Sequence, residues 1–185
     1  MPIPAFDGIL NVLPPHLGDP RQPADLSPFP CTVVELCDGF ATTAKRKQIL
    51  EGFLNFRAEL FALGIQGFQW LDGSFMEDIE MQEGRDPNDL DAVTFVTDPA
   101  TPTDLSARLA MKPNLLDHAY VKGTYSVDHY WVSIGSDPAF LVEQTCYWYA
   151  LFSHRRDRVW KGMLVVHLID KSDDDSARAA LGSKP

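Results

Sequence analysis

The sequence predicts a single mixed α/β domain in which helices flank a mixed β-sheet. Residues 43–63 carry apolar side chains at steps of three and four, which is typical of an amphipathic helix. Short apolar, β-branched or aromatic runs at 67–71, 91–96 and 124–134 end at turn residues and indicate strands. A chain of 185 residues, with 45% hydrophobic and 23% charged residues, can build a core of its own.

The N-terminal segment, residues 1–30, contains eight of the fourteen prolines. Proline donates no backbone hydrogen bond, so this segment is expected to be extended and to pack on the surface of the domain. The domain itself is expected to cover residues 31–169. Thr32 and Glu35 match the capping box, which predicts that a short helix begins there.

The remaining elements follow in chain order. The long helix at 43–63 can end at Gly64. After strands at 67–71 and 91–96, we expect short helices at 103–111 and 113–121 and a third strand at 124–134. Asp137 can cap a helix that runs to residue 154, and residues 162–169 supply a last strand. Residues 170–185 are acidic and then small, which predicts a flexible C-terminal tail.

Charge and composition narrow the range of partners. A net charge of −10 disfavours long nucleic acids, because nonspecific binding depends on cationic contacts to phosphates. No apolar run approaches the roughly 20 residues of a membrane span, and the first residues lack the pattern of a secretion signal. Cys31, Cys37 and Cys146 show no paired spacing and are expected to be thiols in a reducing compartment. We therefore expect a cytoplasmic protein without a membrane partner.

Two motifs predict a site for phosphate and metal. The strand at 67–71 breaks at Gly73-Ser74, where the backbone can approach phosphate oxygens and Ser74 can donate its hydroxyl and amide. Asp89 and Asp91 stand two residues apart at the head of the next strand, so they point to the same side. Mg²⁺ is commonly held by carboxylates together with substrate phosphates, so Mg²⁺ (or Mn²⁺) and a nucleoside triphosphate (NTP) would bind together.

Other polar residues near these motifs have less specific interpretations. Asp128 is the one acid among apolar and aromatic neighbours in the third strand, where a third metal ligand or a general base is expected. His129 should point to the opposite face and pack. The cations in Ser153-His-Arg-Arg-Asp-Arg158 can complement the dipole at the end of a helix, and alternatively Arg155, Arg156 or Lys161 could neutralise phosphate oxygens. The acids around the Gly73-Ser74 turn are interpreted as a solvated loop: Asp72, Glu77, Asp78, Glu80 and Glu83.

This order of motifs resembles the nucleotidyltransferase superfamily of the DNA polymerase β type. More narrowly, the chain resembles an uncharacterised bacterial family of small nucleotidyltransferase-like proteins, up to about residue 169. The matching segments are Leu13-Pro-Pro-His-Leu-Gly-Asp-Pro20, Trp70-Leu-Asp-Gly-Ser-Phe75, Pro87-Asn-Asp-Leu-Asp91, Val127-Asp128, Leu151-Phe-Ser-His-Arg-Arg156 and Trp160-Lys-Gly162.

The resemblance implies a polymerase β type of α/β fold, with two divalent ions on Asp89, Asp91 and Asp128 and a phosphate-binding turn at Gly73 and Ser74. It also implies transfer of a nucleoside monophosphate from an NTP to a hydroxyl of a protein, an RNA end or a small molecule, with loss of pyrophosphate.

Two features depart from the family pattern. The spacer from Ser74 to Asp89 is long, and Phe75 stands where many active members carry a polar or basic residue. The alternative is a catalytically silent nucleotide-sensing or interaction module with a protein partner, for example in a toxin–antitoxin or defence system.

Overall fold

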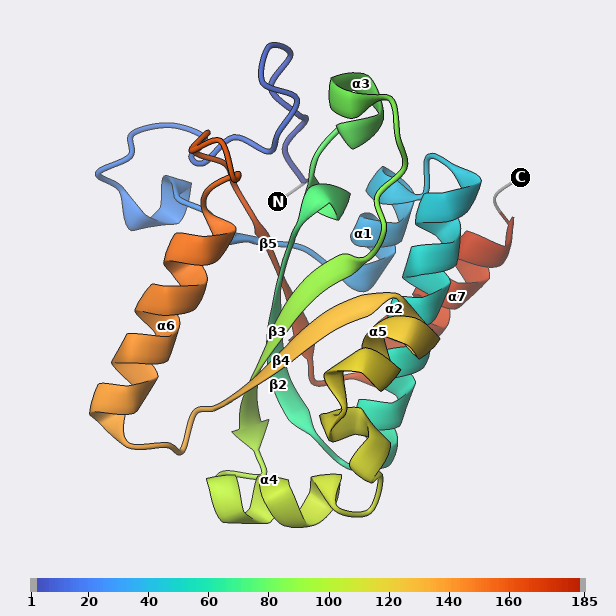
Figure 1. Ribbon diagram of the computed structural model, residues 1–185, viewed down its shortest axis with the longest axis vertical. Coiled ribbons are helices and arrows are strands. Elements are labelled where there is room, and N and C mark those ends of the chain that lie inside the picture. Colours follow the sequence, from blue (N-terminus) through green and yellow to red (C-terminus); the bar gives the residue numbers. More distant parts are fainter. Residues whose placement is uncertain (1–2, 184–185) are drawn as a thin grey trace.

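The computed structural model describes residues 3–183 and confirms the mixed α/β class (Figure 1). In this part of the chain, five strands form one mixed sheet in the order β1-β5-β2-β3-β4. The β1–β5 and β3–β4 pairs are parallel, and β2 is antiparallel to both β5 and β3. The strands are β1 (Phe29–Pro30), β2 (Gln66–Asp72), β3 (Leu90–Asp98), β4 (Val127–Ser133) and β5 (Leu164–Leu168).

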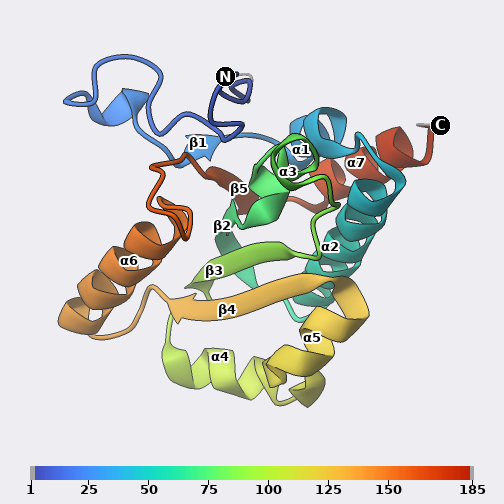
Figure 2. The ribbon, with the colours of Figure 1, turned by 45° about the horizontal axis from the view of Figure 1, so that its top comes forward.

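The helices cover the two faces of the sheet unequally. Figures 1 and 2 show α1, α2, α5 and α7 on one face and α6 on the other, with α4 at one end. The α-helices are α1 (Val33–Phe40), α2 (Ala44–Ala62), α3 (Ile79–Glu83), α4 (Pro102–Leu109), α5 (His118–Tyr125), α6 (Pro138–Phe152) and α7 (Lys171–Ser183). Three 3₁₀ turns complete the described chain: η1 (Pro23–Asp25), η2 (Ser74–Met76) and η3 (Pro113–Leu116).

The helix starts follow their predicted caps. The Thr32 hydroxyl accepts from the Glu35 amide, and the Glu35 carboxylate accepts from the Thr32 amide, so the capping box at α1 is confirmed. Asp137 caps α6 by accepting from two amides of its first turn. The predicted helix at 113–121 is wrong in its bounds, because the chain turns at Asp117, which caps α5 and separates it from η3.

Two apolar cores pack against the sheet because strand side chains alternate between its faces. The larger core lies on the face covered by α1, α2, α5 and α7. The smaller core lies under α6 and is formed by Val93, Phe95, Val132, Trp148, Phe152 and Met163. The chain segment before α1 joins the fold, since Val12 and Leu13 are buried and Phe6 packs edge-on against Phe40.

A buried polar network crosses the larger core. The Arg57 guanidinium donates two hydrogen bonds to Asp174, of 2.7 and 2.6 Å, and one of 2.7 Å to Gln69. Gln69 donates to the Thr94 hydroxyl at 2.9 Å, which in turn lies 2.7 Å from Nε2 of His129. This network links side chains of α2, α7, β2, β3 and β4 by direct hydrogen bonds. Buried charged and polar groups need such partners because they have lost their contacts with water.

The flexible tail predicted over residues 170–185 is instead helix α7, as far as the described residues extend; residues 184–185 lie outside them, as residues 1–2 do at the other end. Asp174, Ala177 and Leu181 are buried on one side of this helix. Acidic residues in its first turn complement the helix dipole, and Asp174 pairs with Arg57. The acidic run therefore begins a docked helix.

Within residues 3–183, no helix combines the length and the apolar composition needed to cross a bilayer. Cys31 and Cys37 are buried and Cys146 is exposed on α6. Burial raises the pKa of the Cys31 thiol to about 12, so this thiol is held in its unreactive protonated form.

Candidate functional site

Three acids lie side by side at one end of the adjacent strands β2, β3 and β4. In the strand register, Asp72 of β2 is the partner of Asp91 of β3, and Asp91 is the partner of Asp128 of β4. Directly opposite residues share a face, so the three carboxylates project from the same side. Asp89 precedes Asp91 by two residues, just before β3 begins. The structure thus brings the predicted Asp89, Asp91 and Asp128 together and adds Asp72 to them.

Gly73 follows directly after Asp72 and lies against Asp91. Its φ of 84° is in the region that glycine favours, and a Cβ at this position would lie 1.7 Å from Oδ2 of Asp91. In this structure the group nearest to Gly73 on that side is therefore the Asp91 carboxylate. Ser74 begins η2 and is half-buried beside this contact.

Lys122 of α5 bridges two of the predicted ligands. Its Nζ lies 2.8 Å from Oδ2 of Asp89 and 2.6 Å from Oδ2 of Asp128. One turn earlier on α5, Nε2 of His118 lies 3.3 Å from Oδ1 of Asp128. Partial burial acts to lower the pKa of Lys122, but its bonds to Asp128 and Asp89 raise this pKa above its usual value. We call Asp89, Asp128 and Lys122 the outer cluster.

Lys161 bridges a second pair of acids. Its Nζ lies 3.0 Å from Oδ1 of Asp72 and 2.7 Å from Oε1 of Glu77, and it donates to the Gly73 carbonyl at 3.2 Å. The prediction that Asp72 and Glu77 belong to a solvated loop is wrong, because both are buried. Burial raises the pKa of Asp72 to about 6, although Lys161 opposes this shift. We call Asp72, Glu77 and Lys161 the inner cluster.

Asp91 lies between the two clusters without a cation of its own. None of the ion pairs among the described residues includes it. Burial, together with the negative charges of Asp89, Asp72 and Asp128, raises the pKa of Asp91 to about 7. A cation or a proton near Asp91 would relieve this repulsion.

The turn after β2 is also stabilised by Arg46, which reaches it from α2 on the other face of the sheet. The Arg46 guanidinium of α2 donates to the carbonyls of Phe75 and Glu77 at 2.7 and 2.5 Å and pairs with Glu80 at 2.6 Å. Two buried cations, Arg46 and Lys161, therefore fix the segment that contains Gly73 and Ser74.

His129 is buried on the Arg46 side of the sheet, against Phe56, and burial lowers its pKa to about 3. Its predicted packing role is confirmed.

In the described part of the chain, no three His, Cys, Asp or Glu side chains are placed so that they could hold a metal ion as they stand. The donor chemistry nevertheless fits a hard cation, since Asp89, Asp91 and Asp128 offer only carboxylate oxygens. One cation, the Lys122 ammonium, already contacts Asp89 and Asp128 at once. A divalent ion would need Lys122 to move away from these oxygens.

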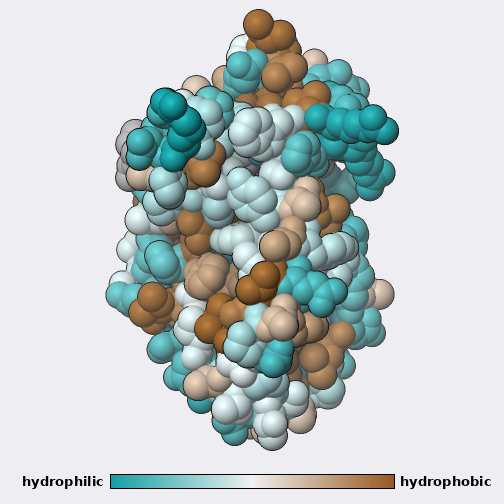
Figure 3. All heavy atoms as spheres, turned by 90° about the vertical axis from the view of Figure 1, so that its left-hand side faces the viewer, coloured by the Kyte–Doolittle hydropathy of each residue, from teal (hydrophilic) through white to brown (hydrophobic). Residues whose placement is uncertain are grey.

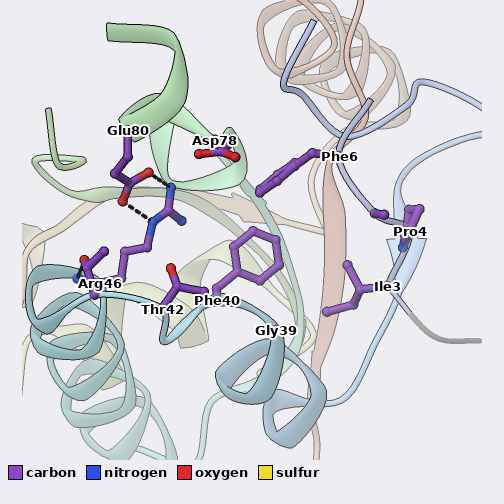
Figure 4. A pocket seen from close by; sticks show the side chains of 11 residues that line it. Ile3, Pro4, Phe6, Gly39, Phe40, Thr42, Arg46, Asp78 and Glu80 are labelled. Atoms are coloured by element: carbon purple, nitrogen blue, oxygen red, sulfur yellow. Dashed lines mark hydrogen bonds and ion pairs between the residues drawn. The ribbon is translucent and has the colours of Figure 1, made fainter. Parts of the chain in front are cut away.

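A cavity of about 480 Å³ opens elsewhere, between the N-terminal segment and the start of α2 (Figure 4). Ile3, Phe6 and Phe40 form its apolar wall, and the paired Arg46 and Glu80 lie at its edge. None of the clustered acids lines it. This cavity is therefore separate from the candidate site.

The outer surface of α6 is apolar. The helix contains a single charged residue, Glu143, and Figure 3 shows apolar side chains gathered on this face of the molecule. The exposed members are Phe140, Val142, Tyr147 and Leu151. Contiguous exposed apolar patches often mark contact surfaces.

The fold and the site together define a mixed α/β domain with an acidic cluster at one end of three adjacent strands, β2, β3 and β4. A family model described as a family of unknown function (DUF6932) matches residues 4–167. The chain therefore belongs to this family, and the match includes every residue of the candidate site. No curated protein and no solved structure shows a significant match to the chain.

Proposed function

We propose that this protein is a small metal-dependent nucleotidyltransferase with a polymerase β type of fold. It would transfer a nucleoside monophosphate from an NTP to a hydroxyl of a protein, an RNA end or a small molecule. The observation that supports this function most strongly is the register of Asp72, Asp91 and Asp128 on three adjacent strands, with Asp89 joined to Asp128 through Lys122. The cytoplasm, where buried thiols such as Cys31 stay reduced, is the location that fits this activity.

Each predicted residue has a role in this chemistry. Asp89 and Asp91 would hold the metal ions, which neutralise phosphate charge when bound. Ser74 would donate its hydroxyl and amide to the triphosphate, from a turn that Arg46 and Lys161 hold in place. Asp128 would serve as third ligand or accept the proton of the attacking hydroxyl, whose oxygen bonds to the α-phosphorus as pyrophosphate leaves.

The test is a thermal-shift titration with each NTP, with and without Mg²⁺ or Mn²⁺, on wild type and on Asp89→Asn/Asp91→Asn. A ligand that binds only the folded state raises Tm by mass action, so the expected result is a metal-dependent rise that the double variant loses. The variant Glu143→Gln/Asp175→Asn removes two acids from exposed positions and should keep the rise. Absence of any rise at millimolar NTP and metal would contradict the proposal.

A catalytically silent interaction module is the second candidate, and two observations favour it. Lys122 already contacts both carboxylates of the outer cluster and offsets one of their two charges, and the exposed face of α6 is largely apolar. Labelled NTP separates the candidates: binding with no release of pyrophosphate and no labelled product, over hours and with varied acceptors, would support the silent module.

A further inference from the structure

Lys122 occupies the position that a metal ion would need. It contacts Oδ2 of both Asp89 and Asp128, at 2.8 and 2.6 Å. Mg²⁺ binds carboxylate oxygens at about 2.1 Å and repels an ammonium at such short range. Lys122 and a divalent ion therefore cannot use these two oxygens at the same time.

Lys122 is also free to leave. Its side chain is 44% exposed, whereas those of Asp89 and Asp128 are each 15% exposed. The side chain projects from α5 rather than from the sheet that carries the acids. Because the ammonium keeps contact with water, it can change its partner at a smaller cost than a fully buried lysine. The acids, in contrast, are held by β3 and β4 and stay in place when the ammonium moves.

We infer that Lys122 is the resident counter-ion of the acidic site and competes with divalent cations for Asp89 and Asp128. This inference rests on the proposed metal-dependent function. The free protein binds metal weakly, because the ammonium has to be displaced. The phosphates of a bound NTP offer the displaced ammonium a new partner, so metal and nucleotide strengthen each other's binding. Lys122 thereby makes metal loading depend on substrate.

The test is a titration of Mn²⁺, with free Mn²⁺ measured by electron paramagnetic resonance, on nucleotide-free wild type and on Lys122→Met. Lys122→Met is expected to bind Mn²⁺ about tenfold more tightly, which lies within the range usual for coupling between two sites. A non-hydrolysable triphosphate should increase the Mn²⁺ affinity of wild type more than that of Lys122→Met. Adding Asp91→Asn to Lys122→Met should abolish Mn²⁺ binding.

Two further variants isolate the effect of position from that of charge. Lys122→Arg keeps a cation beside the acids and should behave as wild type. Lys171→Met removes an exposed lysine that pairs with Asp175 on α7, and it should leave Mn²⁺ affinity unchanged. Equal Mn²⁺ affinity in wild type and Lys122→Met would overturn the role of Lys122 while the metal site stands. Absence of Mn²⁺ binding in every variant at millimolar concentration would overturn both this role and the proposed function.

Discussion

The candidate site contains two lysines that each bridge two carboxylates, and they differ in burial. In the inner cluster, the side chain of Lys161 is 3% exposed and those of Asp72 and Glu77 are each 6% exposed. In the outer cluster, Lys122 is 44% exposed. The same ionic contact is therefore a fixed support in one place and an exchangeable one in the other. Burial decides which, because a buried charge cannot exchange its partner for water.

Removal of the inner lysine should have the largest effect on stability. Lys161→Met leaves Asp72 and Glu77 buried without a cation, which costs about 3–5 kcal/mol in the free energy of unfolding. Urea denaturation at neutral pH measures this loss. Glu77→Gln in the same chain should restore part of the stability, because it removes one of the unpaired charges. A loss no larger than that of Lys122→Met would show that the two clusters do not differ.

Gly73 lies between the inner cluster and Asp91, and its replacement should also have a large effect on stability. Alanine would be strained at φ 84° and would meet the Asp91 carboxylate, so Gly73→Ala should cost about 3 kcal/mol. Gly84 also has a positive φ, of 65°, but has no atom within 4 Å of an added Cβ. Gly84→Ala should therefore cost only the backbone strain, about 1 kcal/mol. Equal losses in urea denaturation would mean that the contact with Asp91 is unimportant.

The position of Asp91 between the clusters predicts a pH dependence. Its pKa is raised from 3.8 to about 7 in the folded protein, so the folded state keeps this proton longer than the unfolded state does. The stability that this proton provides is fully present below pH 4 and is lost as pH rises toward 7. Asp91→Asn removes this loss. Without divalent ions, it should gain about 4 kcal/mol over wild type between pH 4 and 8.

Unfolding midpoints across this pH range check the prediction. Glu143→Gln on the exposed side of α6 is the matched control and should follow the wild-type profile. A constant difference between Asp91→Asn and wild type at every pH would contradict the expected repulsion.

The outer lysine should have the smallest effect on stability. Lys122→Met is expected to lose about 1–2 kcal/mol, less than Lys161→Met, because the Lys122 ammonium is partly solvated although Asp89 and Asp128 are largely buried. High salt should increase the contrast, because at about 1 M the Debye length falls to about 3 Å and screening should reduce the loss caused by Lys122→Met. The loss caused by Lys161→Met should persist at the same salt. A salt-insensitive loss of several kcal/mol for Lys122→Met would place it with the inner cluster.

Local sequence patterns predicted most elements but not the ion pairs. The apolar stripe of α2, the cap at Thr32 and the runs of β2 and β3 depend on neighbours within a few residues, so they are visible in sequence. The pair of Glu77 and Lys161 joins positions 84 residues apart. No local periodicity encodes such a pair, which is why Asp72 and Glu77 were predicted to be solvated.

Contacts between residues far apart in the sequence also explain two other features that the sequence did not predict. Lys122 and His118 reach the acids because helix α5 packs beside the start of β4. In the sequence, these two residues appear only as a basic pair spaced i, i+4 on a short helix, which does not indicate a contact with Asp128. Helix α7 was missed because its acidic start has the composition of a tail, whereas its partner Arg57 lies 117 residues earlier. A search for an unpaired arginine in the apolar stripe of α2 could have indicated that a distant acid was needed.

The link between Arg57 and Asp174 also bears on how the chain is made. Synthesis proceeds from the N-terminus, so α2 and all five strands leave the ribosome before Asp174 does. Until then Arg57 has no carboxylate partner, and the core under α2 has to stay open to water around its guanidinium. Within the described residues, α7 therefore completes the core only after all five strands have been made.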